Sequence, residues 1–207
     1  MKAIVRRFLG IFAVYVLATA CAYAQTTDVK VLAETLKQGG YVVVFRHTAT
    51  NPNQADTNPI NYDDITKQRL LSDAGKEMAR QIGESFKILR IPIGKVYTSK
   101  LNRAVETGRL IGATEVIPTV DITDSSRMAE TGEHERQPEA LKKMVATLPE
   151  AGKNTLIVTH KPNIVAAFGK DWSDVKEGEA TIFHPDGSGK APLVARVQAD
   201  DWVRASK

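Results

Sequence analysis

The sequence predicts an α/β fold: a three-layer sandwich in which a mainly parallel sheet carries helices on both faces and has an antiparallel edge. Two short apolar runs, residues 41–45 and 155–159, are typical of strands buried on both faces. Segments with helical spacing alternate with these runs, as crossovers between parallel strands require. Near the end of the chain, the extended residues 181–183 and 193–197 flank a Pro-Asp-Gly-Ser-Gly turn, which favours an antiparallel pair.

Four elements are predicted before Pro92. Apolar residues at helical spacing predict a short amphipathic helix that stops at Gly39-Gly40: Val29, Leu32, Ala33 and Leu36. The strand at residues 41–45 follows, and residues 48–66 form a long polar loop rich in Asn, Pro and Asp. Ser72 can cap a second helix, which Pro92 closes and whose apolar stripe is Met78, Ile82, Phe86 and Leu89.

Strands and helices continue to alternate after Pro92. We expect strands at residues 96–98, 115–117 and 155–159, and helices at residues 101–111 and from Pro162 onward. Ser99 is a candidate cap for the helix at residues 101–111. Residues 121–138 are polar and irregular, and a further helix follows with the apolar face Leu141, Met144, Val145 and Leu148.

The first 24 residues have the pattern of an export signal. A positive start, an apolar stretch over residues 8–20 and a small-residue cleavage site follow one another: Lys2, Arg6, Arg7, then Ala22-Tyr23-Ala24. We expect cleavage before Gln25 and a periplasmic or secreted protein. The apolar stretch is too short for the roughly 20 residues of a spanning helix, so we expect no stable membrane span after cleavage. Lipidation of Cys21 is the less favoured alternative.

Removing residues 1–24 leaves 183 of the 207 residues, and residues 25–207 suit one domain with a sizeable core. Cys21 is the only cysteine, so that domain has no thiol for disulfides or thiol catalysis. Three of the 28 basic residues and none of the 24 acidic ones lie in the leader, so the formal charge falls from +4 to +1. This balance gives no reason to expect nucleic acid as a partner. The oligomeric state stays open.

Cationic and imidazole side chains follow the predicted buried strands. Arg46 and His47 follow one strand, and His160 follows the other. Ligands of open α/β sheets bind beyond the carboxyl ends of the strands. Arg103, one turn into the helix at residues 101–111, would enter from the same side. Two guanidinium and two imidazole groups suit a compact, doubly charged anion, so the pattern predicts a phosphate site.

The same residue types could instead have structural roles or bind a metal ion. A lone histidine after a strand is commonly a satisfied polar residue, and we interpret His134 and His184 as structural. Two histidines at strand ends could also be zinc ligands. Arg46 and Arg103 argue against a bound cation through like-charge repulsion, and no third ligand stands at a short spacing from either histidine. We therefore expect neither a metal nor a cofactor.

Three segments resemble, in order and spacing, the core motifs of the histidine phosphatase superfamily, also called the phosphoglycerate mutase-like fold. They are Phe45-Arg46-His47-Thr48, Ser99-Lys100-Leu101-Asn102-Arg103-Ala104-Val105-Glu106-Thr107 and Val158-Thr159-His160. The resemblance spans about residues 41–168 and includes Leu71-Ser72-Asp73-Ala74-Gly75, which resembles the entry to the family's first long helix. The Arg-His-Gly-x-Arg-x-Pro signature of the larger acid phosphatases is absent. The resemblance is therefore to the small, single-domain branch.

The resemblance implies a role for each residue of the predicted phosphate site. In this family the first histidine is the nucleophile, which is His47 here, and the paired arginines and second histidine bind phosphate. Those roles fall on Arg46, Arg103 and His160.

The resemblance also implies residues around that site. A carboxylic acid should protonate the leaving oxygen, and Met128-Ala129-Glu130-Thr131-Gly132-Glu133 resembles the segment that supplies it. Glu130 is the first choice and Glu133 the second. Thr48 stands where a glycine commonly follows the nucleophile, and we expect it to line the substrate site. By spacing, Asn53 aligns with an asparagine that contacts phosphate in mutase-like members.

The expected activity is metal-independent hydrolysis of a small phosphomonoester through a phosphohistidine on His47. Because the nucleophile must be unprotonated and the acid protonated, we expect a bell-shaped pH profile. A phosphate-binding module without turnover would keep the arginines but would not need Glu130. A mutase would pass the phosphoryl group to a sugar or glyceryl phosphate, and phosphoprotein phosphatase activity also stays open. The sequence does not identify the natural substrate.

Overall fold

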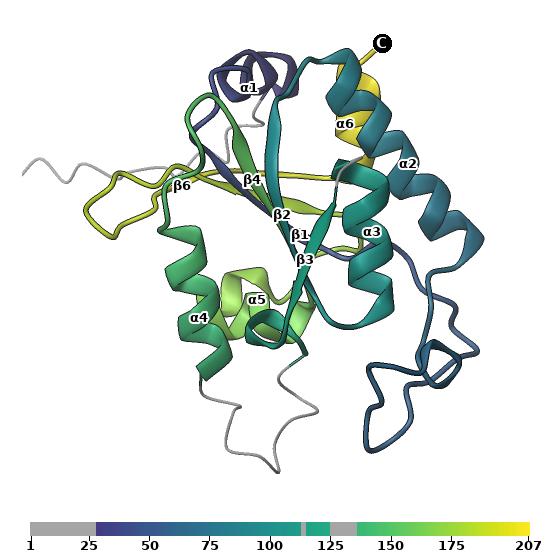
Figure 1. Ribbon diagram of the computed structural model, residues 1–207. Coiled ribbons are helices and arrows are strands. Elements are labelled where there is room, and N and C mark those ends of the chain that lie inside the picture. Colours follow the sequence, from purple (N-terminus) through teal and green to yellow (C-terminus); the bar gives the residue numbers. More distant parts are fainter. Residues whose placement is uncertain (1–27, 113–114, 125–135) are drawn as a thin grey trace, which may run out of the picture.

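Six strands form one mixed sheet in the order β3-β2-β4-β1-β5-β6 (Figure 1). The computed structural model describes residues 28–112, 115–124 and 136–207. In chain order the strands are β1 (Val42–Arg46), β2 (Ile93–Ser99), β3 (Val116–Thr119), β4 (Asn154–Thr159), β5 (Ala180–Phe183) and β6 (Leu193–Val197). Strands β3, β2, β4 and β1 are parallel, whereas β5 runs antiparallel to β1 and β6 antiparallel to β5. The predicted parallel sheet with an antiparallel edge is confirmed.

Helices cover both faces of this sheet (Figure 1). They are α1 (Val29–Leu36), α2 (Asp73–Ile88), α3 (Asn102–Gly112), α4 (Arg136–Val145), α5 (Lys161–Phe168) and α6 (Ala199–Ala205). One core cluster joins α1, α2, α3 and α6 to the face that holds Val43 and Phe45 of β1. The second joins α4 and α5 to the face that holds Val42 and Val44. Because successive strand side chains point to opposite faces, the apolar run of β1 fills both layers.

The loop after β1 is fastened to the start of α2. Ser72 caps α2 as predicted, because its Oγ accepts the backbone N–H of Gly75 at 3.1 Å. The backbone N–H of Ser72 donates to the carbonyl of Ala49 (3.1 Å). A Cβ atom at position 75 would lie 1.9 Å from that carbonyl oxygen, so only glycine permits this approach.

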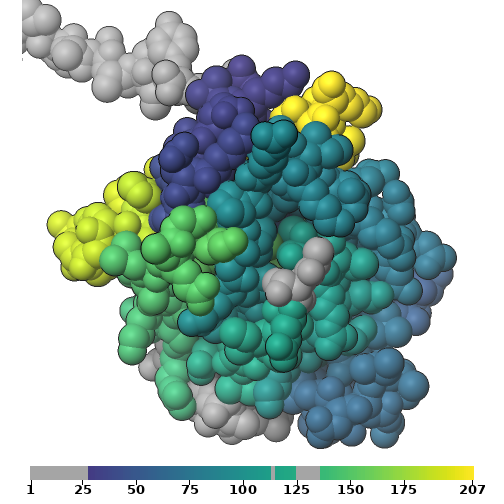
Figure 2. All heavy atoms as spheres, turned by 45° about the horizontal axis from the view of Figure 1, so that its top comes forward, coloured from purple at the N-terminus to yellow at the C-terminus, as the bar shows by residue number. Residues whose placement is uncertain are grey.

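Helix α6 closes the core at the end of the chain and was not predicted. Its Trp202 is fully buried and meets the ring of Phe86 in α2 edge-on, with centroids 4.9 Å apart. Figure 2 shows the yellow C-terminal residues next to the purple residues of α1 on one face of the molecule. Over a helix of seven residues, two buried positions are too few to reveal a period in the sequence.

Several predicted boundaries were wrong. Residues 121–138 were expected to be irregular, but α4 begins at Arg136 and holds Pro138 in its first turn, where proline's missing N–H is not needed. That helix ends at Val145, so Leu148 is not part of its apolar face and is 60% exposed. Strand β2 begins at Ile93, three residues earlier than predicted.

Some predictions lie outside the described residues. These are the export signal at residues 1–24 and the sites at Glu130, Glu133 and His134. None of the described helices has the length and apolar character needed to cross a membrane.

Candidate active site

The two predicted histidines lie side by side at the carboxyl end of the sheet. Strands β1 and β4 are parallel neighbours with Arg46 opposite Thr159, so His47 and His160 each follow the last paired residue of their strand. Their rings lie 5.2 Å apart between centroids, and both residues are almost fully buried. The structure therefore brings the two predicted histidines together at one edge of the sheet.

One hydrogen bond fixes the orientation of the His47 ring. Its Nδ1 lies 2.8 Å from the carbonyl oxygen of Thr48, which can only accept, so Nδ1 carries the proton and Nε2 holds the lone pair. Burial lowers the pKa of His47 to about 3; the hydrogen bond to Thr48 opposes this shift, and the positive charges of Arg103 and Arg46 add to it. The imidazole is therefore neutral near pH 7.

Thr48 is held by Thr107 of α3. The backbone N–H and the hydroxyl of Thr48 both contact Oγ1 of Thr107, at 3.2 and 3.1 Å. On the other side, a Cβ added to Gly178 would lie 3.4 Å from the methyl group of Thr48 and 2.7 Å from the sulfur of Met78. Gly178 also has a φ of +76°, which favours glycine. These contacts explain how threonine is accommodated in place of the family's glycine, and its predicted contact with substrate stays a prediction.

His160 is tied to β2 through Ser99. Its Nε2 lies 2.8 Å from Oγ of Ser99, while its Nδ1 is buried without a hydrogen-bond partner. Burial holds the pKa of His160 well below its usual value, and the charge of Arg103 lowers it further. The Oγ of Ser99 also accepts the backbone N–H of Leu101 (3.1 Å), one residue before α3 begins. Ser99 was predicted only as a helix cap, and its contact with His160 was missed.

Arg103 enters the site from the first turn of α3, as predicted. Its Nη1 donates to both carboxylate oxygens of Asp56, at 2.9 and 3.2 Å, and its Nη2 lies 3.9 Å from Oδ2 of Asp124. The side chain is 1% exposed, yet Nε and Nη2 make no hydrogen bond. Burial lowers the pKa of Arg103, against the raising effect of Asp56. A buried donor without a partner costs about 1–3 kcal/mol, so these two nitrogens are positioned for an acceptor from outside.

Arg46 is held by the segment before β5. Its Nη1 donates to the carbonyl of Val175 (2.8 Å), and its Nη2 lies 3.4 Å from Oε1 of Glu177. Its Nε is buried without a partner. Burial lowers the pKa of Arg46, and Glu177 opposes the shift. The anionic neighbour of Arg46 therefore comes from a carboxylate more than 120 residues away in the chain.

The other predicted site residues are not brought to this cluster. Asn53 is exposed in the loop after β1, where its backbone N–H donates to Oδ1 of Asn51 (3.0 Å). Its predicted contact with phosphate stays a prediction. Glu130 and Glu133 lie outside the described residues. His184, predicted to be structural, is exposed and stacks on Tyr41 at 4.6 Å between ring centroids.

The arrangement suits an anion. The two neutral histidines lie beside each other, and both arginines are close enough to lower the pKa of each. Four nitrogens of these residues are buried without partners: Nε of Arg46, Nε and Nη2 of Arg103, and Nδ1 of His160. The three arginine nitrogens are preorganised donors, which act most strongly where charge develops in a water-poor site. Within the described part of the chain, no three His, Cys, Asp or Glu side chains are grouped as the ligands of a metal ion would be.

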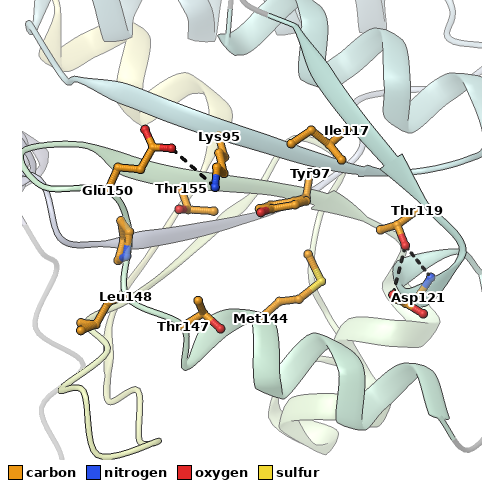
Figure 3. Close-up of a pocket in the computed structure, with 11 residues that line it drawn as sticks. Lys95, Tyr97, Ile117, Thr119, Asp121, Met144, Thr147, Leu148, Glu150 and Thr155 are labelled. Atoms are coloured by element: carbon orange, nitrogen blue, oxygen red, sulfur yellow. Dashed lines mark hydrogen bonds and ion pairs between the residues drawn. The ribbon is translucent and has the colours of Figure 1, made fainter.

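A separate groove of about 370 Å³ lies on the face that α4 covers only in part. Tyr97 and Thr155 form its sheet side and Met144 faces them, while the Lys95–Glu150 ion pair (3.6 Å) closes one end (Figure 3). None of the four histidine and arginine residues of the candidate site lines it. We place the chemistry at the carboxyl end of the sheet, because the buried donors without partners gather there.

Comparison with known proteins reveals the same fold in several solved structures. The protein histidine phosphatase SixA complexed with tungstate matches with a TM-score of 0.55 and 17% identity, over 78% of this chain and 98% of that one. A phosphoserine phosphatase mutant from Entamoeba histolytica in complex with phosphoserine has a TM-score of 0.52 and 14% identity, over 78% and 98%. Mycobacterial glucosyl-3-phosphoglycerate phosphatase with inorganic phosphate has a TM-score of 0.53 and 16% identity, over 78% and 99%.

These identities are low enough that the structures establish the fold alone. No curated protein sequence matches the chain significantly. The family model for the histidine phosphatase superfamily (branch 1) matches residues 42–177, which is well over half of the chain. This protein belongs to the histidine phosphatase superfamily.

Proposed function

We propose that the protein is a metal-independent phosphomonoester hydrolase that forms a phosphohistidine on Nε2 of His47. Membership of the superfamily supports phosphatase activity in general. The observation that carries the finer proposal is the hydrogen bond from Nδ1 of His47 to the carbonyl of Thr48. That bond leaves the lone pair on Nε2, and burial keeps the ring neutral.

Two chemical steps follow. The lone pair of Nε2 forms a bond to phosphorus while the bond from phosphorus to the alcohol oxygen breaks, and a carboxylic acid gives its proton to that oxygen. Glu130 is our first choice for this acid and Glu133 the second. Water then attacks phosphorus, the phosphorus–nitrogen bond breaks, and the same carboxylate takes a proton from the water. The products are the alcohol, inorganic phosphate and the original enzyme.

The donors without partners would stabilise the phosphoryl oxygens through both steps. The hydroxyl of Ser99 donates to Oγ1 of Thr123 (3.3 Å) and therefore accepts Nε2–H of His160 in the free protein, which leaves the lone pair of the neutral ring on Nδ1, the nitrogen without a protein partner. His160 would donate from Nδ1, beside Nε and Nη2 of Arg103, when it takes up a proton together with the bound anion. Loss of one such donor typically slows a reaction by about a hundredfold to a thousandfold.

The test is hydrolysis of an aryl phosphate by the purified protein in the presence of a chelator. His47→Ala should lower turnover by at least about a thousandfold and abolish any acid-labile phosphoprotein, because no other group replaces Nε2. The matched control is His184→Ala, which removes an exposed histidine and should retain wild-type turnover.

The alternatives give different results in the same experiment. Turnover that survives in His47→Ala would overturn the proposed nucleophile. Phosphate binding with no turnover in the wild type would favour a binding module. Transfer of the phosphoryl group to an added alcohol or sugar phosphate, in preference to water, would favour a mutase.

A further inference from the structure

The two arginines that the family motifs supply bring little net charge to this site. Arg46 lies against Glu177, and Arg103 is shared between Asp56 and Asp124. The two histidines are neutral because burial lowers the pKa of each. Among the described residues, three carboxylates therefore lie against two guanidinium groups. A substrate dianion would meet a site that is not attractive on these charges alone.

A third arginine, Arg69, is positioned beside Arg103 by its backbone. The N–H of Arg69 donates to Oδ1 of Asp56 at 2.8 Å, and Nη1 of Arg103 donates to the same oxygen at 2.9 Å. One carboxylate oxygen thus holds both arginines. The neighbouring residue Gln68 is buried, and its Oε1 accepts the backbone N–H of Asn102 at the start of α3 (2.8 Å). The end of the loop is therefore fixed to the same helix that carries Arg103.

Within the described part of the chain, the guanidinium of Arg69 has no carboxylate partner of the kind that holds the other two. Its Nε is buried without a hydrogen-bond partner, and Arg69 belongs to none of the ion pairs between described residues. Its positive charge contributes to lowering the pKa of His47 and of His160, after the larger effect of burial. Arg69 is thus a cation close enough to act on both histidines, and it comes from a segment outside the family motifs recognised in the sequence.

We propose that Arg69 binds the phosphoryl group of the substrate as a third arginine and supplies the positive charge that draws a dianion into the site. The inference rests on the proposed function for its substrate, a phosphomonoester, but it concerns binding rather than turnover. The three arginines would then have different roles in binding. Arg46 and Arg103 are held in place by carboxylates and aim fixed donors, whereas Arg69 compensates the charge of the ligand.

The test is the affinity of the full-length protein for inorganic phosphate, measured by calorimetry at low ionic strength. Arg69→Gln keeps the backbone N–H that bonds to Asp56 and removes the charge. We expect phosphate affinity to fall by about 10- to 100-fold, the range for a hydrogen bond to a charged group. Arg69→Lys, which keeps the charge, should lose less affinity than Arg69→Gln.

The matched control is Lys67→Ala, which removes a positive charge two residues away in the same loop. Lys67 is exposed and pairs with Asp64 (3.4 Å), so its loss should change phosphate affinity less than twofold. The melting temperature of each variant checks that the fold is retained. An affinity in Arg69→Gln within twofold of the wild type would overturn the inference. Equal losses in Lys67→Ala and Arg69→Gln would also overturn it, because the effect would then be one of overall charge.

The same measurement separates this inference from the proposed function. If the wild type binds phosphate but hydrolyses no aryl phosphate, the hydrolase proposal fails while the comparison of affinities still tests Arg69. If turnover is present, Arg69→Gln should raise KM by the factor that it lowers phosphate affinity. An unchanged KM would contradict the role given to Arg69.

Discussion

Arg103 in the candidate site and Arg196 on β6 use their guanidinium groups in opposite ways. All three nitrogens of Arg196 have acceptors: Glu179 (2.6 Å), the carbonyl of Asp171 (2.9 Å) and Asp174 (2.8 Å). Arg103 is more deeply buried, yet two of its three nitrogens have no hydrogen-bond partner. Burial lowers the pKa of both groups, but the hydrogen bonds of Arg196 to Glu179 and Asp174 outweigh it and raise its pKa, whereas the pKa of Arg103 is lowered.

The difference distinguishes an arginine that stabilises the fold from one that awaits a ligand. A satisfied guanidinium holds its acceptors in place, and Arg196 additionally lies over the ring of Trp172 at 5.8 Å. An unsatisfied buried guanidinium costs stability in the free protein and recovers it when an anion binds. Substitution of Arg103 should therefore lower activity, whereas substitution of Arg196 should lower the free energy of unfolding.

The largest expected effect sharpens this contrast at the site. Arg103→Lys keeps a positive charge near Asp56 but removes the fork that presents Nε and Nη2. We expect kcat/KM for an aryl phosphate to fall by about a hundredfold to a thousandfold. Arg109→Lys on the exposed side of the same helix is the control and should change kcat/KM less than twofold. A comparable loss of kcat/KM in both variants would contradict the role of Arg103 in binding the phosphoryl group.

The pH dependence of stability is the next largest effect. The pKa of His47 is about 3 in the folded protein and about 6.5 in the unfolded chain, so the unfolded chain binds the proton first as the pH falls. The stability that comes from a neutral His47 is complete above pH 6.5 and is lost progressively between 6.5 and 3. The free energy of unfolding should fall by up to about 1.4 kcal/mol per pH unit in this window for each such histidine.

Urea unfolding at pH 7, 6 and 5 measures this slope. His160 should contribute in the same direction, because its pKa is also lowered by burial. In His47→Asn the unfolding free energy should change less steeply between pH 6 and 5 than in the wild type. The difference should be the contribution of one histidine, up to about 1.4 kcal/mol per pH unit. A slope unaffected by this substitution would mean that His47 is not the buried neutral group described above.

The smallest effect concerns Arg196. Arg196→Lys should lower the free energy of unfolding by about 1 kcal/mol, because a single ammonium cannot reach all three acceptors. Its kcat/KM should stay within about threefold of the wild type. Chemical denaturation together with steady-state kinetics measures both. A large loss of activity with unchanged stability would reverse the roles assigned to the two arginines.

The strands and the paired histidines could be predicted because their signals are local. Strand β4 ends directly before His160, and the apolar run of β1 ends one residue earlier relative to His47, with Arg46 between them. Neighbouring parallel strands bring such ends together. The partners of these residues could not be predicted in the same way. Asp56 lies 47 residues from Arg103 in the chain, and Ser99 lies 61 residues from His160. Such contacts depend on how segments that are distant in the sequence pack together, and a local sequence pattern does not indicate this packing.

The place of Arg69 beside the candidate site could not be predicted from the sequence either. Arg69 stands between the predicted polar loop and the second predicted helix, next to Lys67 and Gln68, and nothing local distinguishes it from a solvated cation. Only the shared contact with Asp56 places it beside Arg103. Pro138 and Leu148 were misplaced for the opposite reason, since composition and spacing suggested boundaries that the packing of α4 overrides.

The attachment of Arg46 to the segment before β5 has a practical consequence for fragments of this chain. A truncation after α5 would keep the motifs that contain Arg46, His47, Arg103 and His160. It would remove the carbonyl of Val175 and the carboxylate of Glu177 that hold the Arg46 guanidinium, and it would strip β1 of its antiparallel neighbour. Such a fragment would contain every recognisable motif and lack a properly assembled anion site.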